Sequence, residues 1–174
     1  PCCAGSSNGA SKAENPRQLS FALMEAFSWD DKVLIEKAID AREIECSVTG
    51  NSVSYPSDSE TEIVKAYLPG EILPTHTFYD YDAKYNGQVD EITPARVSDE
   101  ITRQVQQTTE KIYRILNAKG IIRVDYIIDA ENNINLLEVN TTPGMTATSF
   151  IPQQVRAAGL DIADVMTEII ESEF

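Results

Sequence analysis

The sequence predicts an α+β fold in which a largely antiparallel β-sheet is flanked by α-helices. The chain has 174 residues, of which 42% are hydrophobic, enough for one domain with a buried core. Two runs of alternating hydrophobic and polar residues, over 121–129 and 134–140, are typical of paired strands. An amphipathic stretch over 98–117 is typical of a helix that packs on one side.

The first nine residues have the composition of a loop, with no helix or strand before them. We therefore expect one domain over 1–174 that is truncated at its N-terminal side. Asn15 and Pro16 open a helix predicted over 16–28, because proline suits the first helical turn and apolar residues recur at helical spacing.

Two strands are predicted next, at 32–36 (KVLIE) and at 42–49 (REIECSVT). The second alternates apolar with polar residues, and we expect the two strands to be neighbours in the sheet. The segments 51–62 and 79–94 carry no periodicity and are expected to be loops.

The predicted helix over 98–117 begins at Ser98, a suitable N-cap, with Asp99 and Glu100 in the first turn, where acids complement the helix dipole. Gly120 lies just past its end. The tail over 161–173 repeats the apolar spacing and predicts a second helix that packs on the core.

The two alternating runs are joined by the turn-prone residues 130–133, which predicts an antiparallel hairpin. If Asp129 pairs with Ile134, Asp125 lies opposite Glu138 and Arg123 lies opposite Asn140. Strand alternation then places the apolar side chains on the other face, namely Ile122, Val124, Tyr126, Leu137 and Val139.

The polar face of this hairpin carries an arginine, two carboxylates and an amide. Like charges opposite one another destabilise a sheet unless a cation lies between them. Carboxylate and amide oxygens suit hard ions, and Mg²⁺ is commonly held by one or two carboxylates with substrate phosphates. The hairpin predicts a magnesium and nucleotide site, and the alternative is a solvated face on which Arg123 pairs with a neighbouring acid.

Composition excludes several other classes of protein. Twenty-eight acidic against fourteen basic residues give a net charge of −14, which repels nucleic acid. We expect a soluble protein without membrane association, since no apolar stretch approaches the 18 or so residues of a membrane span. Cysteines 2, 3 and 46 form no disulfide framework and favour the cytoplasm. The single histidine, His76, excludes a histidine-based zinc site or serine triad.

The string LEVNTTPGMT at 137–146, followed by Ser149, closely resembles the EVNTxPGMTxxS signature of D-alanine–D-alanine ligases in the ATP-grasp superfamily. Further matches in the family's order occur at 5–12 (GSSNGASK), 33–36 (VLIE), 42–43 (RE) and 78–85 (FYDYDAKY). The resemblance implies an ATP-grasp C-terminal domain that binds ATP.

Carried over by position, Asp125, Glu138 and Asn140 would hold two Mg²⁺ ions, with Mn²⁺ as a substitute, that bridge the ATP phosphates. The resemblance gives the remaining ATP contacts to Ser7 in the glycine-rich phosphate loop, Glu36 with the backbone of Lys37 and Ile39 at the adenine, Glu43 at the ribose, and Lys84 at the phosphates.

The resemblance also implies roles in the ligation step. Tyr85 and Ser6 would join a hydrogen-bond network near the second substrate, and Arg123 with the Gly144 N–H would stabilise an oxyanion. Ser149 and the Phe150 N–H would bind the carboxylate of the second D-alanine. The Ala-Lys-Tyr run at 83–85 resembles the ligases that make the dipeptide rather than the lactate ester.

The implied reaction joins two D-alanines through an acyl phosphate, for peptidoglycan precursor synthesis. In the family, the N-terminal domain binds the first D-alanine, so we expect no turnover by this chain alone. The resemblance also implies that the full-length protein is a homodimer. Two alternatives stay open: another ATP-grasp carboxylate–amine ligase with a different acceptor, and a non-catalytic nucleotide-binding or interaction module.

Overall fold

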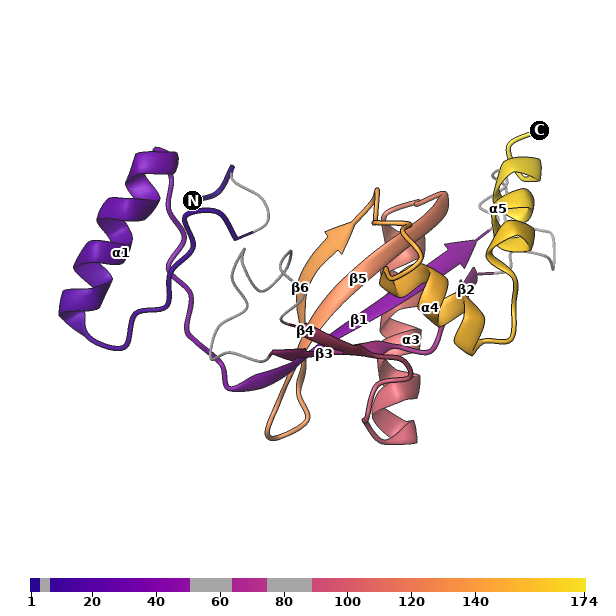
Figure 1. Cartoon of the computed structure of the whole chain (residues 1–174), viewed down its shortest axis with the longest axis horizontal. Helices are drawn as coiled ribbons and strands as arrows, with labels where there is room; N and C mark the ends of the chain where they lie inside the picture. The colour runs from indigo at the N-terminus through magenta and orange to yellow at the C-terminus, as the bar shows by residue number, and fades with distance from the viewer. Residues whose placement is uncertain (4–6, 51–63, 75–88) are drawn as a thin grey trace. The chain divides into compact units, whose positions relative to one another are not determined.

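The computed structural model describes residues 1–3, 7–50, 64–74 and 89–174 (Figure 1). The chain divides into two compact units, one of residues 1–40 and 73–90 and the other of residues 41–72 and 91–174. An antiparallel sheet with flanking helices is present, which confirms the predicted fold class. The expectation of one domain over 1–174 stays a prediction.

The first unit contains α1, Pro16–Trp29, close to the predicted bounds. Asn15 caps this helix by accepting a hydrogen bond from the Gln18 N–H at 3.0 Å. The predicted strand at 32–36 is wrong, as is its pairing with the next strand, because residues 32–40 form no regular element. Leu34 and Ile35 are 65% and 66% exposed, so the apolar run lacks the neighbouring strand that would stabilise it within the described part of the chain.

The sheet is ordered β4-β3-β1-β5-β6, with β2 also paired to β1. The central strands are β1, Ala41–Gly50, and β5, Gly120–Asp129, and β6, Ile134–Asn140, follows at the edge. On the other side of β1 lie β2, Val64–Ala66, and β3, Gly70–Pro74, while β4 is Val89–Ile92. The strand β4 corrects the expectation of a loop over 79–94.

Within the described ranges, three further helices cover the sheet. The long helix α3, Asp99–Ile115, lies on one face, and the predictions of helices at 98–117 and 161–173 are confirmed with slightly shorter bounds. The helices α4, Phe150–Ala157, and α5, Ile162–Glu171, pack against the other face around Ile151, Val155 and Val165. The helix α4 was not predicted.

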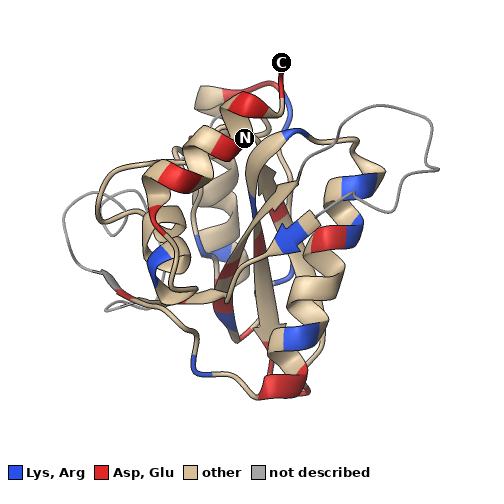
Figure 2. Cartoon of the chain, turned by 90° about the vertical axis from the view of Figure 1, so that its right-hand side faces the viewer, with Lys and Arg blue, Asp and Glu red and all other residues tan. Residues whose placement is uncertain are grey.

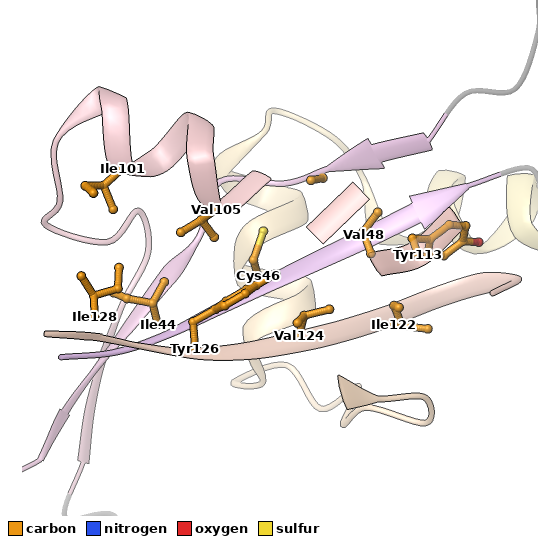
Figure 3. Close-up of a cluster of buried hydrophobic side chains, with 11 residues drawn as sticks. Ile44, Cys46, Val48, Ile101, Val105, Tyr113, Ile122, Val124, Tyr126 and Ile128 are labelled. Atoms are coloured by element: carbon orange, nitrogen blue, oxygen red, sulfur yellow. The ribbon is translucent and has the colours of Figure 1, made fainter. Parts of the chain in front are cut away.

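The larger core lies between α3 and the sheet (Figure 3). Even-numbered residues of β1 and β5 point into it, as strand alternation requires. Its buried members are Ile44, Cys46, Val48, Ala66, Ile101, Val105, Tyr113, Ile122, Val124, Tyr126 and Ile128. Odd-numbered residues of the same strands therefore lie on the opposite face, which carries the polar hairpin residues.

One buried side chain from α4 completes the backbone hydrogen bonding of β1. Pairing with β3 ends at Glu45 and pairing with β2 begins at Val48, which leaves a gap. Gln154, fully buried, fills it: its Oε1 accepts from the Ser47 N–H at 2.9 Å and its Nε2 donates to the Glu45 carbonyl at 2.9 Å. The amide thus imitates a strand partner and fixes the backbone around Glu45.

A second buried polar group, Glu71 on β3, ties the sheet to the segment before α3. Its carboxylate accepts from Arg42 Nη2 at 2.7 Å, from the Arg96 N–H at 3.0 Å and from Arg96 Nε at 3.1 Å. Burial alone would raise the pKa of Glu71, but the hydrogen bonds from Arg96 and Arg42 and the charge of Arg42 hold it below its ordinary value.

We expect Gln154→Met to lower the free energy of unfolding of the full-length protein by about 2 to 5 kcal/mol, because methionine fits the space but leaves a buried N–H and a buried C=O unpaired. The same change at exposed Gln104 should cost less than about 0.5 kcal/mol. Urea unfolding followed by circular dichroism measures both, and equal losses would contradict the role given to Gln154.

We expect Glu71→Gln to cost about 3 kcal/mol at neutral pH, because it removes a buried partner of two arginines. The lowered pKa of Glu71 means that its stabilisation is present above the unfolded value of 4.5 and is lost as the pH falls through the folded value. The difference between wild type and variant should therefore shrink on acidification in unfolding experiments. A difference that is constant with pH would show that the charge of Glu71 is not what stabilises the sheet.

Candidate active site

The polar residues of the second unit form two cross-strand rows on the sheet face opposite α3. In the first row Glu45 of β1, Asp125 of β5 and Glu138 of β6 lie directly opposite one another. In the second row Ser47, Arg123 and Asn140 do the same. Figure 2 shows bands of acidic and of basic residues on the strands of the sheet. The predicted pairings of Asp125 with Glu138 and of Arg123 with Asn140 are confirmed.

A β-bulge in β6 produces this register. Near the turn Ile128 pairs with Ile134 and Tyr126 with Leu136, so the predicted pairing of Asp129 with Ile134 is wrong by one residue. A shift between Asp125 and Tyr126 restores the offset and leaves Leu137 as the extra residue. Leu137 is 49% exposed, which corrects its predicted place on the core face. Without the bulge, Leu137 would oppose Asp125 and Glu138 would turn to the other face.

Arg123 and Asp125 form the centre of the site. Arg123 donates from Nε to Asp125 Oδ1 at 2.8 Å and from Nη2 to Asp125 Oδ2 at 2.9 Å. Asn140 Nδ2 donates to Asp125 Oδ2 at 2.8 Å and to Glu138 Oε1 at 3.2 Å. Burial lowers the pKa of Arg123, but the hydrogen bonds to Asp125 and the charges of Glu45 and Asp125 outweigh it, so the pKa lies above its ordinary value and Arg123 stays charged.

Glu45 is a third carboxylate of the site, and no role was predicted for it from the sequence. It is 5% exposed, and its Oε2 lies 2.9 Å from Arg123 Nε. Burial and the charge of Asp125 raise the pKa of Glu45, while Arg123 acts in the opposite direction. The signal was present in the alternation of β1, but only the pairing of β1 with β5 shows that Glu45 faces Asp125.

The burial of these residues decides against a simple solvated face. Asp125 is 2% exposed and Ser47 is fully buried, although Glu138 at the edge strand is exposed. The arginine does pair with a neighbouring acid, as the alternative reading of the hairpin required, but it does so in the interior. A polar cluster this deep is a more specific arrangement than a solvent-facing strand carries.

The donor set fits a divalent cation. Asn140 contacts both carboxylates through its amide nitrogen, so a half-turn of that amide would aim its oxygen at the same point. Two carboxylates and an amide oxygen are ligands that Mg²⁺ and Mn²⁺ accept. Within residues 1–3, 7–50, 64–74 and 89–174, no three His, Cys, Asp or Glu side chains cluster as a metal centre would require. The site would therefore need the amide and a ligand such as phosphate to complete the coordination.

The segment after β6 brings Gly144, Ser149 and Phe150 together at the start of α4. The Ser149 Oγ accepts from the Thr146 N–H at 3.1 Å, and a side chain at position 144 would meet this Oγ at 3.2 Å. Phe150 is the first residue of α4, with its ring buried and its N–H in the first turn, where helix N–H groups attract anions.

The remaining predicted residues fall into three groups. Glu43 is half-buried on the same face of β1 as Glu45. Ser7, Glu36, Lys37 and Ile39 belong to the first unit, where Ser7 opens a turn with φ 58° and the other three are exposed. Ser6, Lys84 and Tyr85 lie outside the described residues, as do His76 and the predicted loop at 51–62.

The family model described as D-ala D-ala ligase C-terminus matches residues 1–171. A D-alanine–D-alanine ligase of Bacteroides fragilis is 56% identical over 178 residues, which cover 100% of this chain and 51% of the relative. A D-alanine–D-alanine ligase of Porphyromonas gingivalis is 50% identical over 98% of this chain and 49% of its own length. The chain spans about half the length of the curated relatives it matches.

Solved structures agree with the sequence relatives. The VanG D-Ala:D-Ser ligase of Enterococcus faecalis superposes with a TM-score of 0.80 at 30% identity, covering 98% of this chain and 47% of that structure. The D-alanine–D-alanine ligase of Coxiella burnetii superposes with a TM-score of 0.76 at 30% identity over 96% of this chain and 41% of its own.

None of the helices in the described ranges is long and apolar enough to cross a membrane.

We expect Arg123→Met to lower the free energy of unfolding of the full-length protein by about 3 kcal/mol, because it leaves two buried carboxylates without their cation. Arg114→Met is the matched control, since among the described residues the only ion pair of the exposed Arg114 side chain is with Glu110 at 3.9 Å, and it should cost less than about 0.5 kcal/mol. Chemical unfolding of both variants measures the difference. Equal effects would mean that Arg123 does not neutralise the site.

Proposed function

The chain belongs to the D-alanine–D-alanine ligase C-terminal family, and we propose that it supplies the ATP-binding and catalytic half of such a ligase. The observation that carries the proposal is the hydrogen-bonded cluster of Arg123, Asp125, Glu138 and Asn140 around the buried Asp125 carboxylate. Oxygen ligands beside a fixed guanidinium are what phosphoryl transfer to a carboxylate requires.

In this proposal Asp125, Glu138 and Asn140 hold two Mg²⁺ ions. When bound, the ions neutralise the ATP phosphates as charge moves during phosphoryl transfer. The residues fit because both carboxylates already share one amide neighbour, and the half-turn of Asn140 completes the ligand set. Ser7, Glu36, Lys37, Ile39, Glu43 and Lys84 are proposed to bind the nucleotide.

The proposed reaction begins with attack of a D-alanine carboxylate on the γ-phosphate of ATP, which gives an acyl phosphate and ADP. The amine of the second D-alanine then attacks the acyl carbon, and phosphate leaves. Arg123 and the Gly144 N–H would stabilise the oxyanion, Ser149 and the Phe150 N–H would hold the second carboxylate, and Ser6 with Tyr85 would contact the second substrate. The product would enter peptidoglycan precursor synthesis.

Because the chain spans about half of its relatives, the first D-alanine would be bound by the part of the ligase outside these residues. Turnover is therefore proposed for the full-length protein, as a homodimer in the cytoplasm, and not for this chain alone. The exposed Cys2 and Cys3 and the buried Cys46, all free thiols, fit a reducing compartment.

D-serine is an alternative acceptor, because the solved VanG structure that shares the fold at 30% identity is a D-Ala:D-Ser ligase. The curated D-alanine–D-alanine ligases are closer, with 56% identity for the Bacteroides fragilis enzyme. We therefore expect the full-length protein to favour D-alanine over D-serine as the acceptor in a phosphate-release assay. A preference for D-serine, or for an unrelated amine, would move the protein to another carboxylate–amine ligase.

We expect Glu138→Gln to lower the kcat of the full-length protein at least about 100-fold, because it removes a metal carboxylate. Glu131→Gln changes an exposed acid in the turn of the same hairpin and should leave kcat within about twofold. ADP formation with ATP, Mg²⁺ and D-alanine measures both variants. Full activity of Glu138→Gln would favour a non-catalytic nucleotide-binding module instead.

A further inference from the structure

Arg123 lies beside two buried carboxylates, and it forms hydrogen bonds with Asp125 but not with Glu45. Its Nε–H donates to Asp125 Oδ1 at 2.8 Å, while Glu45 Oε2 lies 2.9 Å from the same nitrogen. Since Nε carries one hydrogen, only one of the two oxygens receives an aligned hydrogen bond. Glu45 Oε2 makes none with any described residue, although the side chain is 5% exposed.

A buried oxygen without a hydrogen bond costs stability, so its retention beside a guanidinium calls for an explanation. The backbone of Glu45 is held in place by two routes, since β5 pairs with it on one side and the Gln154 side chain accepts and donates at the gap on the other. These contacts fix the backbone of Glu45 at a position where its side chain faces Arg123.

In the proposed function, Asp125 binds both the Arg123 guanidinium and a divalent cation, and these two interactions compete. Arg123 donates to both oxygens of Asp125 at 2.8 and 2.9 Å and Asn140 donates to one of them, so most acceptor positions of this carboxylate are already used. Two positive groups on one carboxylate also repel each other. Release of one oxygen of Asp125 by the guanidinium would favour cation binding, and it requires another acceptor for the Arg123 N–H nearby.

We propose that Glu45 is a positioning residue that takes over the Nε–H of Arg123 and so releases Asp125 to bind the divalent cation. The acceptor is already at hydrogen-bond distance, so a rotation of the guanidinium suffices and Arg123 stays at the site. Glu45 acts through Arg123 and touches neither the cation nor the substrates. This inference rests on the proposed function.

The test measures Mn²⁺ binding to the full-length protein with a non-hydrolysable ATP analogue, by calorimetry or electron paramagnetic resonance. We expect Glu45→Gln to weaken Mn²⁺ binding about tenfold, because the variant offers Arg123 a weaker acceptor and Asp125 stays engaged. Raising the Mn²⁺ concentration should restore kcat in the variant, which a purely structural role of Glu45 would not allow.

Glu91→Gln is the matched control. Glu91 is a neighbouring acid whose carboxylate accepts from Gln153 Nε2 at 2.8 Å. Burial raises its pKa above the ordinary value, although the Gln153 hydrogen bond and the charge of Arg123 act in the opposite direction. Its replacement makes the same change in side-chain type near the site, and Mn²⁺ binding should change less than about twofold. Equal losses in the two variants would overturn the inference in favour of a general charge effect.

Glu45→Asp serves as a second variant, because it keeps the carboxylate but withdraws it from Arg123 by one methylene group, and thermal unfolding reports whether each variant folds. We expect an affinity for Mn²⁺ between those of wild type and Glu45→Gln, and wild-type affinity in Glu45→Asp would overturn the inference. If wild type itself takes up no Mn²⁺ with the nucleotide analogue, the proposed function fails as well. Normal binding by wild type with no loss in Glu45→Gln removes only the role of Glu45.

Discussion

Two carboxylates, Glu45 and Asp125, lie directly opposite each other on neighbouring strands and are almost wholly buried. Two acidic groups so close together in the interior are costly unless a positive group lies beside them, and Arg123 Nε lies 2.9 Å from Glu45 and 2.8 Å from Asp125. The other features of the site follow from this requirement. Gln154 holds the backbone of Glu45, and Asn140 joins Asp125 to Glu138.

The burial of these charged groups lowers the stability of the sheet but forms a site that can bind a ligand. A sheet built only for stability would place apolar residues on both covered faces, as it does between the strands and α3. The face towards α4 instead carries two rows of polar groups, with an unpaired oxygen on Glu45 and another on Ser47 among the described residues. Such departures from good packing are typical of functional sites, where a ligand supplies what the protein alone lacks.

The bulge at Leu137 is the one-residue difference in β6 that distinguishes this site from a regular hairpin. One extra residue exchanges an exposed leucine for a carboxylate at the position opposite Asp125. The right cross-strand pairing was predicted from a turn register that is wrong by one residue, and the bulge compensated for the difference. Hydrophobic alternation does not reveal a bulge, because the extra residue breaks the pattern only once.

Local patterns in the sequence determined the helices at α1, α3 and α5, the strands β1, β5 and β6, and the residues of the hairpin that meet across β5 and β6. These depend on caps, periodicity and turns, which act between residues close in the chain. The failed strand at 32–36 has the right composition but lacks a partner in the described structure, and pairing is a tertiary property. Only the fold placed Glu45 beside Asp125 and brought Gln154 into β1 from 109 residues away, because such contacts depend on packing between distant segments.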